Sequence, residues 1–105
     1  MTDEALIERV TRTIVERFNP KRVILFGSRA RGDADADSDI DLFIEMESDK
    51  TRAERTLDVI SAFGLRKWSM DVFVYTPEEA ERDRGKIGTL ASIVEAEGRL
   101  LYERA

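Results

Sequence analysis

The chain has 105 residues, of which 42% are hydrophobic, and a formal net charge of −5, which predicts one small domain spanning residues 1–105. It contains neither cysteine nor histidine, which excludes disulfides, thiolate metal sites and a histidine general base, and leaves carboxylates as ligands for a hard cation. Proteins that bind long nucleic acids usually carry a basic face, so the acidic balance argues against direct nucleic-acid binding. No apolar run approaches the ~20 residues that cross a bilayer and no signal-peptide pattern is present, so we expect a cytoplasmic protein without membrane contact.

Residues 3–18 predict an amphipathic helix, because apolar side chains recur at helical spacing. Thr2 is the expected N-cap, and Asn19-Pro20 ends the helix. The residues expected to face the core are Leu6, Ile7, Val10, Ile14, Val15 and Phe18. We expect this helix to serve core packing alone.

Two extended segments follow, over residues 22–26 and 39–46. The first does not alternate between polar and apolar residues, which predicts a strand buried on both faces. The second alternates, with Ile40, Leu42 and Ile44 on one face and Asp39, Asp41 and Phe43 on the other. Two carboxylates that share a strand face with an aromatic ring break the usual pattern, and such a break is typical of a functional site.

The second half of the chain predicts three helices, over residues 50–63, 77–84 and 87–97, and a last short strand over 100–102. The first of these helices ends at Gly64, and the second has a capping box that begins at Thr76. Their expected inward residues are Ala53, Leu57, Ile60 and Phe63 in the first helix, and Ile87, Leu90, Ala91 and Val94 in the last. The order of elements indicates an α/β (α+β) fold, a small mixed sheet with helices mainly on one face.

A third strand over residues 69–75 lies between these helices and alternates as well. Met70, Val72 and Val74 face one way, and Asp71, Phe73 and Tyr75 face the other. An unpaired carboxylate in an apolar strand is costly. If this strand lies beside 39–46 with the same face sense, Asp71 joins Asp39 and Asp41.

The turn after the first strand has the features of a phosphate-binding segment. Gly27 allows a sharp turn and a close approach of the backbone to a ligand. The hydroxyl of Ser28 and the free N–H groups of a helix start can hold phosphate oxygens. Arg29 and Arg31 add planar cations for further phosphate oxygens, and Gly32 ends the short helix.

Asp39 and Asp41 predict a metal site beside that turn. They are two residues apart on an extended segment, so their carboxylates point to the same side of the sheet. Two neighbouring carboxylates repel each other unless a cation lies between them, and such oxygen ligands suit Mg²⁺. The preceding loop with Asp33, Asp35 and Asp37 does not have the spacing of a calcium-binding loop, so we expect it to be solvated. Phosphate-binding and magnesium-binding residues side by side suggest a metal-bound nucleoside triphosphate.

The pattern of Gly-Ser, ten residues and Asp-x-Asp resembles the signature of the DNA polymerase beta-like nucleotidyltransferase superfamily. The string from Gly27 to Leu42, GSRARGDADADSDIDL, is similar to the minimal nucleotidyltransferase (MNT) proteins. In that family the MNT chain is typically paired with a HEPN toxin, an RNase. The resemblance covers nearly the whole chain and implies a nucleotidyltransferase fold.

The resemblance also implies a mechanism. Gly27 and Ser28 would hold the β- and γ-phosphates of ATP, and Asp39, Asp41 and Asp71 would bind two Mg²⁺ ions, with Asp71 helping to take the proton of the attacking hydroxyl. The acceptor implied is a tyrosine of the HEPN toxin, so that transfer of AMP makes this chain an antitoxin. An exposed catalytic face on so short a chain fits a macromolecular acceptor.

Two other functions remain open at this point. The chain could neutralise a toxin by binding alone, although pure binding does not require clustered metal carboxylates. It could also transfer a nucleotide to a small molecule with the help of another subunit.

Overall fold

The computed structural model describes residues 3–34 and 38–105, so the predictions for Thr2, Asp35 and Asp37 lie outside it. The elements in chain order are α1 (Asp3–Phe18), β1 (Arg22–Phe26), α2 (Ser28–Arg31), β2 (Ile40–Glu45), α3 (Arg52–Ser61), β3 (Met70–Tyr75), α4 (Pro77–Arg84), α5 (Leu90–Glu97) and β4 (Arg99–Glu103). The predicted order of helices and strands is confirmed. No helix in the described ranges has the length and apolar character to span a membrane.

The four strands form one mixed sheet in the order β3-β2-β1-β4. β1 is antiparallel to both β2 and β4, whereas β2 and β3 are parallel. The parallel pair needs a crossover, and α3 supplies it. β3 and β4 are therefore the two edges, and the predicted α/β class with a small mixed sheet is confirmed.

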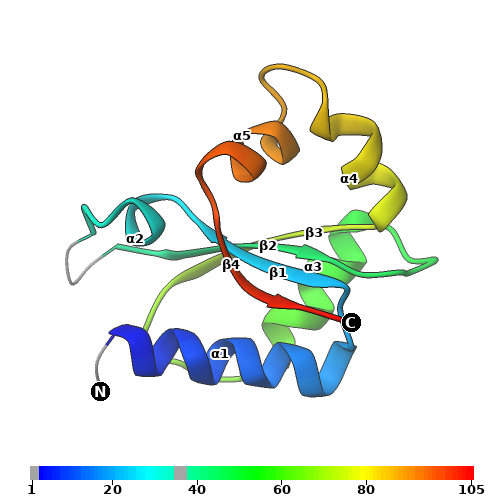
Figure 1. Cartoon of the computed structure of the whole chain (residues 1–105). Helices are drawn as coiled ribbons and strands as arrows, with labels where there is room; N and C mark the ends of the chain where they lie inside the picture. Colours follow the sequence, from blue (N-terminus) through cyan, green and yellow to red (C-terminus); the bar gives the residue numbers. More distant parts are fainter. Residues whose placement is uncertain (1–2, 35–37) are drawn as a thin grey trace.

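Helices lie on both sides of this sheet (Figure 1). The two longest, α1 and α3, cover one face, as expected for most of the helical mass, and the short helices α4 and α5 cover part of the other face. The predicted faces of β2 are confirmed, because Ile40, Leu42 and Ile44 belong to the α1–α3 core and Phe43 belongs to the α4–α5 core. The sheet face that carries Asp39 and Asp41 is thus the face that only the short helices α4 and α5 cover in part.

The inward face of α3 differs from the prediction. Ala53 and Leu57 were expected to be buried, but both are exposed, and the buried residues of α3 are Arg55 and Val59. Arg55 is tolerated inside because its guanidinium donates to the carbonyls of Lys50 (3.0 Å) and Val74 (3.2 Å) and to Glu79 Oε1 (2.7 Å). The prediction is confirmed at the end of the segment, where Ile60 and Phe63 pack against the core, and it is wrong for the first turns, because a periodicity that counts arginine as polar misses Arg55.

The start of the last helix also differs. Ile87 was expected to face the core, but it is fully exposed in the turn before α5. The helix begins only at Leu90, because the Thr89 side chain accepts from Ser92 N–H and caps it. The capping box of α4, with Thr76 as N-cap and Glu79 at the third position, is confirmed.

Candidate active site

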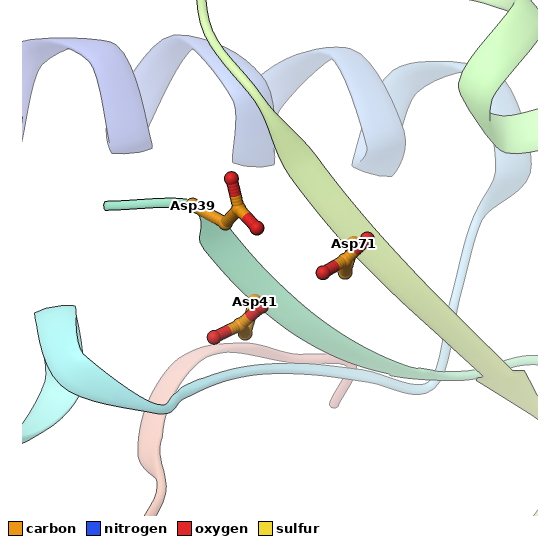
Figure 2. A group of neighbouring side chains, drawn as sticks. All are labelled: Asp39, Asp41 and Asp71. Carbon is orange, nitrogen blue, oxygen red and sulfur yellow. The ribbon is translucent and has the colours of Figure 1, made fainter. Parts of the chain in front are cut away.

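Three aspartates meet where β2 and β3 begin. The strand register pairs Phe26 with Asp41 and Asp41 with Asp71, and Asp39 lies just before β2. One carboxylate oxygen from each of Asp39, Asp41 and Asp71 lies within 4.8 Å of the others, and Figure 2 shows the three side chains gathered at this end of the sheet. The structure therefore brings together the three carboxylates that the sequence proposed as a group.

The electrostatics of this carboxylate triad favour a cation. The pKa of Asp41 is raised by burial, and then by the negative charges of Asp71 and Asp39, while Arg31 opposes the shift. In the described part of the chain, no lysine or arginine forms an ion pair with any of the three. A hard divalent cation bound by these carboxylate oxygens would remove the repulsion between the three aspartates. The residues therefore fit Mg²⁺.

Gly27 lies directly against the triad. Its φ of 77° is in the left-handed region, and a Cβ at this position would collide with Asp41 Oδ2. A residue with a side chain would be strained and would also displace the carboxylate. Glycine is therefore needed here for a close approach between the turn and the metal ligands.

The short helix α2 begins at this turn. Its first backbone bonds run from the N–H groups of Ala30 and Arg31 to the carbonyl of Gly27, each at 3.1 Å. The helix itself leaves the N–H groups of Ser28 and Arg29 unused, as at any helix start. Ser28 is half-buried beside them, so the turn offers backbone donors and a hydroxyl next to the triad.

The two arginines of α2 differ in their surroundings. The Arg29 side chain is largely buried, and its Nε and Nη2 donate to the carbonyl of Ser38 at 3.2 and 2.7 Å, while Nη1 lies 2.7 Å from Asp3 Oδ2. The Arg29 guanidinium is thus engaged by partners within the protein, and it holds Ser38, the residue that precedes Asp39. Arg31 is exposed, with Nε 3.4 Å from Asp33 Oδ2. Of the two, Arg31 is the one whose side chain is exposed and could turn towards a phosphate.

Sequence patterns alone assign no role to two aromatic rings beside the triad. Phe26 and Phe73 lie on the triad's face of the sheet with ring centroids 5.7 Å apart. Phe73 is exposed, and Phe26 is half-buried. The alternation of β3 already placed Phe73 on the side of Asp71, but periodicity could not show that the ring stays uncovered.

Residues 7–104 match the nucleotidyltransferase domain family, so the chain belongs to that family. The chain resembles a crystal structure described as a candidate nucleotidyltransferase from Sulfolobus solfataricus, with 25% identity and a TM-score of 0.66 over 95% of this chain and 79% of the other. It also shares its fold with a structure described as a toxin–antitoxin with AMP-PNP, at 22% identity and a TM-score of 0.60 over 92% of this chain and 73% of the other. No curated protein matches the sequence.

Proposed function

We propose that this chain is a Mg²⁺-dependent nucleotidyltransferase that transfers AMP from ATP to a tyrosine hydroxyl of a HEPN-type toxin and so acts as its antitoxin. The observation that carries the proposal is the convergence of three carboxylates within 4.8 Å of one another, against the Gly27 turn. Family membership supports the reaction class.

Each site residue has a part in that reaction. Gly27 and Ser28 hold the β- and γ-phosphates with backbone and hydroxyl donors, and Arg31 adds a cation at the rim. Asp39, Asp41 and Asp71 would hold two Mg²⁺ ions. When bound, the ions neutralise phosphate charge and make the acceptor hydroxyl more acidic. Arg29 acts differently, because it holds the carbonyl of Ser38 and so keeps Asp39 in place.

The transfer itself is a substitution at the α-phosphorus. The acceptor oxygen forms a bond to this phosphorus, and the bond to the oxygen bridging the α- and β-phosphates breaks, so that pyrophosphate leaves. The hydroxyl proton passes to a carboxylate oxygen of Asp71 and then to solvent. These residues position the reactants and move the proton, and the products are AMP-tyrosine and pyrophosphate.

Two observations support a protein as the acceptor. Asp39 and Asp71 are both exposed, so the triad opens onto the surface instead of into an enclosed cavity. A structure with the same fold is described as a toxin–antitoxin with AMP-PNP. The exposed triad of this chain fits a macromolecular acceptor. The AMP-PNP and the toxin–antitoxin description of the structure with the same fold fit the transfer of AMP to a toxin.

The decisive experiment is intact-mass spectrometry of the protein encoded beside this chain. That protein is incubated with this chain, Mg²⁺ and each nucleoside triphosphate in turn, and the Asp39→Asn/Asp41→Asn double variant is the control. We expect the neighbouring protein to gain the mass of one or more AMP groups only when both ATP and the wild-type chain are present. A tight complex with both versions and no mass gain would replace this proposal with an antitoxin that acts by binding. Transfer to a small molecule instead of a protein would support the nucleotidyltransferase reaction but contradict a toxin as the acceptor.

A further inference from the structure

Residues 64–69, the β3 entry loop, lie between α3 and β3 and reach the sheet beside the carboxylate triad. The last residue of the loop, Ser69, accepts a hydrogen bond from the N–H of Ile40 at 3.0 Å, and Ile40 directly follows Asp39. β3 then begins and carries Asp71 into the triad. Figure 1 shows this loop arriving at the end of the sheet where α2 lies.

The β3 entry loop holds two neighbouring cations that the fold leaves without a counter-charge. Within the described residues, no carboxylate forms an ion pair with Arg66 or Lys67. Most arginines and lysines of this chain, by contrast, lie in ion pairs such as Arg55 with Glu79. The chain has a net charge of −5, so it does not lack carboxylates. Cations that remain unpaired in an acidic chain indicate a surface that meets negative charge from another molecule.

The same loop has further groups that the fold does not use. Arg66 Nε and Trp68 Nε1 are buried and have no hydrogen-bond partner among the described residues, and a buried donor without an acceptor is costly. Leu65 is fully exposed to solvent. Because arginine and tryptophan are enriched in the residues that dominate protein–protein binding, the composition of the loop is typical of a surface that binds another protein.

Trp68 holds the loop in place from below. Its ring lies edge-to-face against Phe63, with ring centroids 6.4 Å apart, and both rings pack on the core that α1 and α3 cover. Lys67, the residue before it, is exposed. The loop therefore presents its cations from an anchored base, which reduces the entropy lost when a partner binds.

The arrangement of the site places this loop on the side of the acceptor. Gly27 lies on one side of Asp41, and Asp71 lies on the other side, one strand farther out. In the proposed reaction the triphosphate is held at the Gly27 turn, so pyrophosphate leaves on that side. Because the attacking and leaving oxygens of phosphoryl transfer are roughly in line, the acceptor hydroxyl approaches from the side of Asp71. The β3 entry loop leads into the strand that carries Asp71, so an acceptor on this side meets the loop.

We propose that the β3 entry loop is the docking surface for the acceptor protein, and that Arg66 and Lys67 bind carboxylates that neighbour the acceptor tyrosine. The occupant is an acidic segment, because the two cations have no counter-charge within the fold and complement negative charge on a partner. This inference rests on the proposed function and names the surface that selects its acceptor.

The first test measures transfer kinetics with Lys67→Glu, using the acceptor protein identified by the intact-mass experiment. We expect the KM for the acceptor to rise at least about tenfold, because like charges then face each other across the interface. The kcat, the KM for ATP and the melting temperature should stay unchanged. Lys21→Glu is the matched control, because Lys21 is also exposed, has no ion pair in the described part of the chain, and precedes β1 at the end of the sheet away from the triad.

The second test exchanges the charges across the interface. Peptide mapping of the modified acceptor locates the tyrosine, and the carboxylates that neighbour it are changed to lysine. This acceptor should be a poor substrate for the wild-type chain and should regain transfer with Lys67→Glu. Added salt should raise the acceptor KM of the wild-type chain more than that of Lys67→Glu, because salt screens an exposed charge pair. A modified tyrosine without neighbouring carboxylates would overturn the inference.

The third test follows the loop itself. Trp68 is the only tryptophan of the chain, so incorporation of fluorotryptophan places a single fluorine label in the β3 entry loop. Its resonance should shift when unlabelled acceptor is added without ATP, and Lys67→Glu should need a higher acceptor concentration for the same shift.

Three results would overturn this inference while the transferase function stands. They are an unchanged acceptor KM for Lys67→Glu, an equal rise of this KM for Lys21→Glu, and an unchanged fluorine resonance of Trp68 in the complex. If the wild-type chain transfers nucleotide to no protein, the proposed function and this inference fall together.

Discussion

The strand β2 carries carboxylates at both ends, and the two ends are opposite in their electrostatics. At its start, Asp39 and Asp41 meet Asp71 without any described ion pair, and the pKa of Asp41 is raised by burial and by its neighbours. At its end, Glu45 is 1% exposed and is bound by Arg22 and Arg84. One end of the strand keeps its negative charge available to a ligand, and the other neutralises it within the fold.

The Glu45 end joins four elements. Arg22 on β1 donates to Glu45 through Nε, and Arg84 on α4 contacts the other carboxylate oxygen at 3.3 Å. Both arginines also reach Glu95 Oε1 on α5, at 3.1 and 3.0 Å. A buried carboxylate is acceptable when its charge and lone pairs are satisfied in this way. The comparison teaches that burial with partners makes a carboxylate structural, whereas clustering without partners makes it available for chemistry.

The largest expected effect is on transfer. Asp41→Asn should reduce the rate of nucleotidyl transfer at least about a hundredfold, because one of the three carboxylates that would hold Mg²⁺ against the reacting phosphate is lost. The melting temperature should stay the same or rise, since the substitution relieves repulsion from Asp39 and Asp71. Transfer assays and thermal unfolding check both parts. A variant that keeps wild-type transfer would remove Asp41 from the reaction.

The same change at the other end of β2 should act on stability instead. Glu45→Gln leaves two arginines beside a neutral, buried amide, which should cost about 3 kcal/mol of the free energy of unfolding. Chemical denaturation measures this loss, and transfer per folded molecule should remain near wild type. Equal stability of Glu45→Gln and wild type would show that the Arg22 and Arg84 contacts add nothing to the fold.

Alanine variants of the two glycines that flank α2 distinguish the effect of backbone strain from the effect of site geometry. Gly27 and Gly32 have φ of 77° and 86°, but a Cβ meets Asp41 only at Gly27 and meets open space at Gly32. Each change to alanine should cost about 1 kcal/mol of stability from backbone strain. Gly27→Ala should in addition lower transfer at least about tenfold, because Asp41 must move. Similar transfer rates for the two variants would contradict the role of the close approach.

The last predicted effect appears only at acidic pH and concerns the contribution of Glu79 to stability. Burial acts to raise its pKa, but hydrogen bonds from Arg55 and the Thr76 N–H outweigh burial and lower it from 4.5 to about 2. A carboxyl with a depressed folded pKa stabilises the protein above its unfolded pKa, so this contribution is lost as pH falls from about 4.5 towards 2. Glu79→Gln should flatten the stability profile in this window. The matched control is Glu78→Gln, an exposed neighbour on the same helix, which should leave the slope as it is.

The sequence predicted most of the elements and one half of the site, for a local reason. The Gly27-Ser28 turn, the placement of Asp39 and Asp41 on one face, and the alternation of β3 depend on neighbouring residues alone. Backbone turn preferences and the two-residue period of a strand act over a few positions. The turn and the strand faces can therefore be predicted from local sequence, because they do not depend on contacts with distant residues.

Other features depended on contacts between distant segments. The first turns of α3 turn Arg55 inward because its partners lie on β3 and α4, so the apolar pattern was wrong at Ala53 and Leu57, although Ile60 packs on the core as predicted. Arg29 and Arg31 share the same local sequence, yet the proximity of Ser38 and Asp3 engages the first and leaves the second exposed.

The residue types, their spacing and the strand faces were thus determined by the sequence itself. The tertiary structure decided which strands are neighbours. The parallel register of β2 and β3 sets Asp71 directly beside Asp41, and the ring of Phe73 on the edge strand β3 stays exposed next to them. The physical reason is that strand pairing is a non-local interaction, set by burial of both sheet faces together.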